Sequence, residues 1–436
     1  MDSDSTEVPI AVPVLRIKLT PPFRLSNLIA FYYASLVNVA SLVYINGALP
    51  YLLSNFLNIS EGQQGSRIGD LGLYNELTII ATVTLWGSLS DKIGRRYIYA
   101  IGFLLMSISI FIHPTTDNFN VVIVYRIIFA IGAAASVSML TAVLGDYPTN
   151  GSRGRTAGVL GITSGLGALL GLFVFLRIPK WVNTPSTTAN GQIMYWCVGG
   201  WIAISSVIIA LGLSGEINKH NKHVSYSQIL TDGFLAARNP RIALSYLSSF
   251  AARGDSVVLT SLLSLWITQY ETAHGASPEE SIAKAGEISG ICQLIALLTA
   301  PLFGFLADRY DRIVCQIVAA AIATCGYLFL FFLTSPRGAL VYIAVCIVGF
   351  GEISMVVTSQ ILVTSESPKD IRGAVSGFFS LAGSLSVLLS TKLGGYLFDH
   401  WSPTGPFFLV AMYNIIVLIV SGIIYLKGRL HVAKIQ

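Results

Sequence analysis

Apolar runs of roughly membrane-spanning length, separated by short polar turns, recur along the whole chain. A helix needs about 20 apolar residues to cross a bilayer, and twelve runs come close to this length. The first run, residues 25–56, contains Pro50, so we expect its helix to bend near that proline. The pattern predicts an all-α, polytopic membrane protein of twelve transmembrane helices. The other spans are expected at residues 71–90, 97–113, 119–144, 156–176, 192–213, 242–270, 286–307, 313–334, 338–365, 374–398 and 407–426.

The composition supports a membrane protein and argues against nucleic-acid binding. Of the 436 residues, 53% are hydrophobic and 11% are charged, which is more apolar surface than a soluble core can use. The formal net charge is +5, but the cations form no basic face. Nineteen of the 27 lysines and arginines fall in the tails and loops on one side of the predicted spans, and five fall in the loops opposite. By the positive-inside rule, we expect both termini to be cytoplasmic.

A charged turn between the second and third runs recurs half a chain later. Residues 87–96 read Gly-Ser-Leu-Ser-Asp-Lys-Ile-Gly-Arg-Arg, and residues 304–312 place glycine, leucine, aspartate, a cation and arginine at the same relative positions, 217 residues further on. Arg153-Gly154 and Arg372-Gly373 form a second such pair, offset by 219 residues. The chain is therefore predicted to hold two copies of one unit. The expected segments are a tail at 1–24, a six-helix bundle at 25–213, a cytoplasmic linker at 214–240, a second six-helix bundle at 241–426 and a tail at 427–436.

The turn at residues 87–96 resembles the loop 2–3 signature of the major facilitator superfamily. Its recurrence resembles the degenerate second copy that the family carries after helix 8. The resemblance implies two pseudo-symmetric six-helix bundles that rock about a site near mid-membrane and give alternating access to a small-molecule substrate. Asp91 and Arg95, with the adjoining helix end, would then form an inner latch. The other residues expected to act in gating are Arg96, Asp146, Arg153, Asp308 and Arg312.

Four ionisable residues lie well inside predicted spans, namely Arg126, Arg253, Asp255 and Glu352. A charge at mid-bilayer costs at least about 2.5–3.5 kcal/mol, so each needs a partner, a water-filled cavity or a task. Arg253 and Asp255 are two residues apart, which is about 200° around a helix, so they cannot simply neutralise each other. Glu352 is flanked by Gly349 and Gly351, which would admit water or a substrate. A buried carboxyl of this kind can load and release a proton.

In the superfamily fold, helices 1, 4, 7 and 10 line the central cavity, and the resemblance implies that the four charged residues line it too. Glu352 or Asp255 would then carry a coupling proton, with Arg126 and Arg253 tuning that carboxyl or holding a substrate carboxylate. A purely structural pair of Glu352 with one of the arginines is the alternative. The first-helix residues expected in the same cavity are Asn38, Tyr44 and Asn46.

Two other features concern helix surfaces. Glu76 and Lys392 lie one to two turns from the predicted outer surface, where long side chains can reach headgroups or form a peripheral salt bridge. The fifth span carries glycines at the spacing that lets helices approach closely. They are Gly161, Gly165, Gly167 and Gly171.

We expect a secondary active transporter of a small organic solute, with an organic anion as one candidate, driven by protons. The alternatives are a drug/proton efflux antiporter and a non-transporting sensor or partner protein of the same fold. No nucleophile elbow, HExxH, P-loop or paired CxxC pattern occurs, so no enzyme is predicted. We expect no cofactor or metal, a monomer, and a plasma or organelle membrane. The substrate, the direction of transport and the glycosylation of Asn58 stay open.

Overall fold

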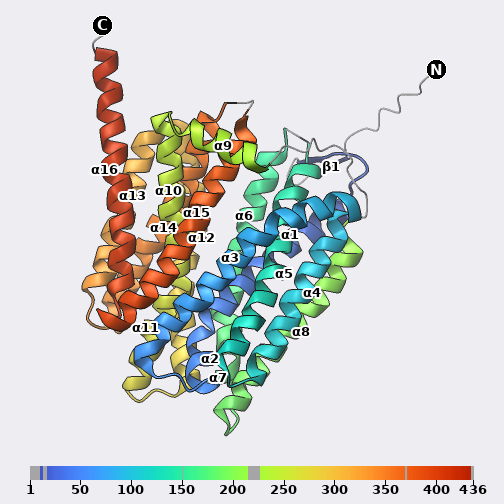
Figure 1. Ribbon diagram of the computed structural model, residues 1–436, viewed down its shortest axis with the longest axis vertical. Helices are drawn as coiled ribbons and strands as arrows, with labels where there is room; N and C mark the ends of the chain where they lie inside the picture. The colour runs from blue at the N-terminus through green and yellow to red at the C-terminus, as the bar shows by residue number, and fades with distance from the viewer. Residues whose placement is uncertain (1–9, 13–16, 150, 215–225, 369–370, 434–436) are drawn as a thin grey trace, which may run out of the picture. The chain divides into compact units, whose positions relative to one another are not determined.

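The computed structural model describes residues 10–12, 17–149, 151–214, 226–368 and 371–433, which are almost entirely helical (Figure 1). Eleven helical segments within these ranges are long and apolar enough to cross a membrane. The twelfth span is α3 (Glu61–Ile93), a 33-residue helix that is not among these eleven. The predicted twelve-helix architecture is confirmed, and the protein is an integral, multi-pass membrane protein.

The chain forms two compact units that depart from the two sequence halves at one place. The first unit holds Met1–Ile45 and Leu77–Asn221, and the second holds Asn46–Glu76 and Lys222–Gln436. The outer part of the first helical hairpin is therefore grouped with the second half of the sequence. We call the side of the loops rich in lysine and arginine the inner side, and the opposite side the outer side.

In the first unit, α4 packs against both α5 and α8. Gly102 and Gly132 allow α4 and α5 to come close, because a Cβ on Gly132 would lie 2.5 Å from the Gly102 carbonyl oxygen. The helices are α1 (Leu25–Gly47), α4 (Arg95–Ile112), α5 (Phe119–Asp146), α6 (Arg153–Leu169), α7 (Ile178–Val182) and α8 (Thr187–Gly212), with short turns η1 (His113–Thr115), η2 (Leu170–Val174) and η3 (Phe175–Arg177).

The described part of the N-terminal tail is held on the inner side of this unit. Strands β1 (Ile10–Val12) and β2 (Ile17–Leu19) pair antiparallel. The Lys18 backbone N–H donates to Ser152 Oγ at 2.8 Å, and the Thr149 N–H donates to the Lys18 carbonyl at 2.9 Å. The tail therefore contributes a short ribbon to the loop between α5 and α6.

In the second unit, α13 packs between α14 and α16, while α12 packs on α14 and α10 packs on α15 (Figure 1). A capping box at Ser277 and Glu280 starts α12, and the Asp311 carboxylate caps α13. The helices are α2 (Leu49–Asn55), α10 (Pro240–Val257), α11 (Leu263–Ala273), α12 (Pro278–Arg309), α13 (Arg312–Phe332), α14 (Ala339–Glu366), α15 (Arg372–His400) and α16 (Gly405–Ala433), with the π-turn η4 (Val258–Leu262) between α10 and α11.

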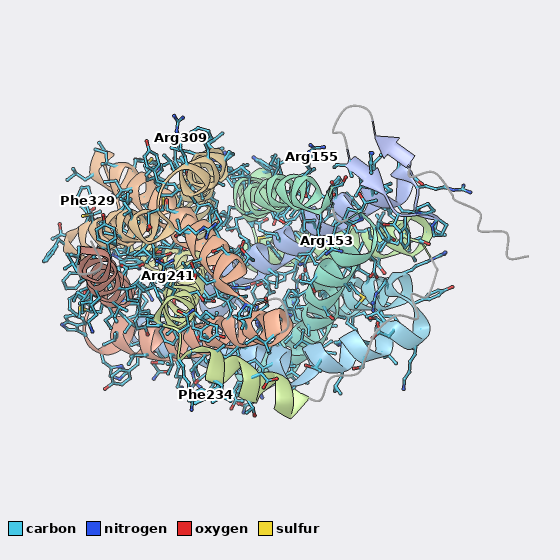
Figure 2. All side chains as sticks on the ribbon, turned by 90° about the horizontal axis from the view of Figure 1, so that it is seen from above. Arg153, Arg155, Phe234, Arg241, Arg309 and Phe329 are labelled. Atoms are coloured by element: carbon cyan, nitrogen blue, oxygen red, sulfur yellow. The ribbon has the colours of Figure 1, made fainter. Side chains whose placement is uncertain are left out.

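Two departures from regular spans follow from local sequence. The first span breaks near Pro50, as predicted: α1 ends at Gly47, and α2 begins with Pro50 in its first turn, where its missing N–H has no helical partner to lose. The linker contains an unpredicted helix, α9 (Tyr226–Ala236), which packs on α15. Tyr246 Oη donates to the Gly233 carbonyl at 2.9 Å, and Phe234 is exposed (Figure 2).

Candidate functional site

Asp255 of α10 is completely buried in the second unit. Its carboxylate faces Asn414 of α16, whose Nδ2 lies 3.4 Å from each carboxylate oxygen and also donates to the Val410 carbonyl at 3.1 Å. Among the described side chains, no lysine or arginine forms an ion pair with Asp255. A buried carboxylate with so weak a set of donors is costly as an anion.

Glu352 of α14 is also buried, with 5% of its surface exposed, but its surroundings are richer in donors. Ser256 Oγ donates to Glu352 Oε1 at 2.6 Å, and Gln293 Nε2 donates to Oε2 at 3.2 Å. These partners come from α10 and α12. Because Ser256 follows Asp255 directly, the two carboxyl groups are close enough to interact electrostatically. The structure thus brings two predicted site residues together and gives Glu352 neutral partners rather than Arg253.

Arg253 points away from Asp255, as the spacing on a helix predicts. Its side chain is exposed and packs on α15, where its Cγ lies 2.6 Å from the position that a Cβ on Gly383 would occupy. Glu76 of α3 is buried on the same side, hydrogen-bonded with Ser384 of α15 and in electrostatic contact with Arg253. The expectation that Glu76 reaches lipid headgroups or a peripheral partner is wrong, because this part of α3 packs into the second unit.

Arg126 of α5 lies in the first unit and is 2% exposed. Its guanidinium carbon lies 5.4 Å from the centroid of the Phe129 ring and interacts electrostatically with Tyr195 of α8. Tyr44 of α1 packs on Tyr195 with ring centroids 5.7 Å apart. Arg126 therefore does not extend to the membrane surface. It lies in an aromatic environment together with one of the predicted first-helix residues.

The other two first-helix residues lie in different surroundings. Asn38 is buried between α1 and α5, where Ser136 Oγ donates to Asn38 Oδ1 at 2.6 Å. This bond ties the two helices together. Asn46 belongs to the second unit and is half-buried.

The residues expected to form the inner latch meet around Arg95 in the first unit. Arg95 Nη1 lies 2.5 Å from Asp91 Oδ1, and Arg95 Nε lies 3.1 Å from Asp146 Oδ2. Arg153 Nη2, at the start of α6 (Figure 2), donates to the Gly145 carbonyl at 2.7 Å. Arg96 is half-buried, with its guanidinium 5.5 Å from the Tyr97 ring centroid. The turn at residues 87–96 is thus joined to the end of α5.

The second copy of this motif has a different set of partners. Arg312, the counterpart of Arg95, is exposed at the start of α13. Glu366, near the counterpart of Asp146, pairs instead with Arg241 of α10 at 3.1 Å. The side chain of Asp308 lies outside the described residues. Among the described side chains, the Arg95–Asp146 pair of the first copy is thus replaced in the second copy by the Arg241–Glu366 pair.

A contact on the outer side of the second unit includes the peripheral salt bridge that was one expectation for Lys392, with a partner that the sequence did not identify. Lys392 of α15 pairs with Asp70 of α3. Asp399 of α15 accepts hydrogen bonds from the backbone N–H groups of Gly65 at 2.9 Å and Ser66 at 2.6 Å. The backbones of α3 and α15 nearly touch, since a Cβ on Gly395 would lie 2.1 Å from the Gly65 carbonyl oxygen. Charge, capping and glycine packing therefore hold these two helices together.

The sequence held weak signals for the residues that it missed. Gln293 and Asn414 are amides within otherwise apolar stretches of α12 and α16. Such residues in a membrane helix usually face other helices, because an amide in lipid would lose its hydrogen bonds. Nothing in the local pattern identifies Asp255 and Glu352 as their partners, since the partner depends on how each helix is rotated.

Comparisons with known proteins agree with this architecture. Magnetosome protein MamH of Paramagnetospirillum magneticum is 25% identical over 399 residues, covering 89% of this chain and 90% of that protein. Magnetosome protein MamZ of Magnetospirillum gryphiswaldense is 26% identical over 87% of this chain, which spans 59% of MamZ. The crystal structure of the nucleoside transporter NupG shares the fold, with a TM-score of 0.72 at 13% identity over 91% of this chain and 98% of NupG. The family model of the Major Facilitator Superfamily matches residues 31–391, and the protein therefore belongs to this family of membrane transporters.

Proposed function

We propose that the protein is a proton-coupled secondary transporter of a small organic solute. The observation that carries the proposal is the pair of buried carboxyl groups, Asp255 and Glu352, which have no cationic partner among the described side chains. A structural ion pair would account for buried carboxylates without transport. Two nearby carboxyl groups whose described hydrogen-bond donors are all neutral suit reversible protonation instead.

The two carboxyls have different roles in this proposal. Asp255 binds the proton, because among the described residues its hydrogen-bond donor is the Asn414 amide, at 3.4 Å. Glu352 is held as an anion by Ser256 and Gln293, and its charge makes protonation of Asp255 more favourable. Arg253, whose side chain is exposed, offers charge to a substrate carboxylate, which makes an organic anion the preferred substrate class.

We infer that alternating access involves contacts at the two sides. On the outer side, α3 is joined to α15 through Gly395 and the Asp70–Lys392 pair. On the inner side, Arg95 joins Asp91 to Asp146. We infer that these contacts form and break in turn as the transporter cycles. We also infer cytoplasmic termini and a functional monomer, the first supported by the basic loops.

The test uses proteoliposomes and a mixed pool of cell metabolites, because the substrate is not known. Compounds accumulated by the vesicles are measured by mass spectrometry with and without an imposed pH gradient. We expect at least one small organic acid to accumulate only with the gradient, and Asp255→Asn to abolish this dependence. Glu366→Gln, which removes a carboxyl outside the membrane interior, is the control and should keep it. Accumulation in the wild type that ignores the gradient would overturn proton coupling and leave facilitated diffusion.

A further inference from the structure

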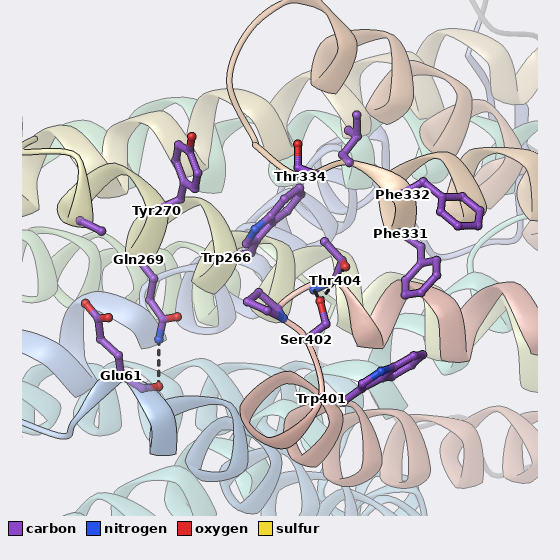
Figure 3. Close-up of a pocket in the computed structure, with 13 residues that line it drawn as sticks. Glu61, Trp266, Gln269, Tyr270, Phe331, Phe332, Thr334, Trp401, Ser402 and Thr404 are labelled. Atoms are coloured by element: carbon purple, nitrogen blue, oxygen red, sulfur yellow. Dashed lines mark hydrogen bonds between the residues drawn. The ribbon is translucent and has the colours of Figure 1, made fainter.

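A pocket of about 660 Å³ lies on the outer side of the second unit (Figure 3). Neither Asp255 nor Glu352 lines it. It is formed where the start of α3 meets α11, the end of α13 and the loop between α15 and α16. All of its lining residues are described and lie within one unit. The transport mechanism proposed above does not use this pocket.

Five of the thirteen residues that line the pocket are aromatic. Trp266 is only 5% exposed and lies against Phe407, with ring centroids 5.7 Å apart. Trp401 packs on Phe331 at 5.5 Å, and 54% of its surface is exposed. Tryptophans at a membrane surface commonly act as interfacial anchors. Trp266 does not fit that role, because its ring is almost completely buried.

The charge around the pocket is negative. Glu61 is the only charged residue in the described lining, and the Gln269 amide donates to its backbone carbonyl at 3.1 Å (Figure 3). A nearby cation, Arg337, lies 5.6 Å from the Tyr270 ring, but it is neutralised by two bonds to Glu271 at 2.9 and 2.6 Å. The pocket therefore combines aromatic rings with one carboxylate that forms no ion pair with any described lysine or arginine.

We propose that this pocket binds an organic ammonium group. Ring faces attract a cation through their quadrupole, and the attraction is strongest for tryptophan and for weakly hydrated quaternary ammonium ions. Glu61 supplies the opposite charge at the rim. The ammonium group comes either from the headgroup of a zwitterionic lipid or from a free organic cation. Both sources place the same chemistry against Trp266, Trp401 and Glu61.

The test measures tetramethylammonium binding to the full-length protein in lipid nanodiscs. The readout is the rise in melting temperature with tetramethylammonium chloride, compared with sodium chloride at equal ionic strength. In phosphatidylglycerol discs, which contain no ammonium headgroup, we expect a saturable rise. The apparent affinity should fall about threefold to tenfold in Glu61→Gln and in Trp401→Ala. The matched controls are Asp117→Asn and Trp181→Ala, which alter an exposed acid and an exposed tryptophan in the first unit.

Phosphatidylcholine discs distinguish the two sources. If the lipid headgroup occupies the pocket, tetramethylammonium raises the melting temperature in phosphatidylglycerol discs but not in phosphatidylcholine discs. If the natural ligand is a free cation, the effect is equal in both. The proposal is overturned if tetramethylammonium acts no differently from sodium in phosphatidylglycerol, or if pocket and control variants change equally. Because no transport is measured, this outcome is independent of proton coupling.

Discussion

Replacing Gly395 with alanine should open the outer contact between α3 and α15. The added Cβ would lie 2.1 Å from the Gly65 carbonyl oxygen and 2.8 Å from its carbonyl carbon. Ordinary contact begins at 3.4 Å, so the helices must separate by about 1.3 Å at this point. Both partners are backbone atoms, so no side-chain rotation can relieve the clash.

The expected shift of the conformational equilibrium follows from the energetic cost of overpacking. Inserting one carbon into a closely packed contact typically costs about 1–3 kcal/mol. If the contact forms in one state of the transport cycle and breaks in the other, this cost shifts the equilibrium about 5- to 150-fold toward the open state. Gly62→Ala is the control, because Gly62 lies on α3, the partner helix of this contact, and its Cβ would meet nothing within 4 Å.

The assay is the rate at which a membrane-impermeant maleimide labels a cysteine placed at Ser66, in a variant lacking the five native cysteines. Ser66 is half-buried and its N–H donates to Asp399 across the contact. Gly395→Ala should raise the labelling rate at least fivefold, and Gly62→Ala should leave it unchanged. Equal rates in both variants, with equal melting temperatures, would refute the claim that this contact gates access.

Two other predictions concern the first unit. Asp91→Asn removes one of the two carboxylates that hold Arg95. It should slow transport with little change in substrate affinity, because it alters the conformational equilibrium rather than the binding site. Loss of substrate binding with normal turnover in proteoliposomes would contradict this prediction. Gly167→Ala places a Cβ 2.3 Å from the Leu36 carbonyl oxygen and should lower the free energy of unfolding by about 1–3 kcal/mol. In the control Gly161→Ala, the Cβ meets nothing within 4 Å, so the free energy of unfolding should stay unchanged. Thermal unfolding in detergent compares the two, and equal midpoints would show that α1 and α6 separate without cost.

Much of the fold could be predicted from local sequence alone. The number of spans follows from runs of apolar residues, because a helix in lipid must satisfy its own backbone hydrogen bonds over a fixed length. Pro50 predicted the break between α1 and α2. The charged turn at residues 87–96 and its second copy identified the family, which the match over residues 31–391 confirms. The buried ionisable residues could be recognised because charge is rare inside a membrane.

Only the tertiary structure determined the partners of these residues. Asp255 lies against Asn414, Glu352 against Gln293 and Glu76 against Ser384, and none of these pairs is near in sequence. A partner is set by the rotation of each helix about its axis and by the distance at which two helices pack. Those quantities depend on all contacts of the bundle together. For the same reason the sequence could predict the apolar length of a span but not that Gly65 of α3 would lie against Gly395 of α15.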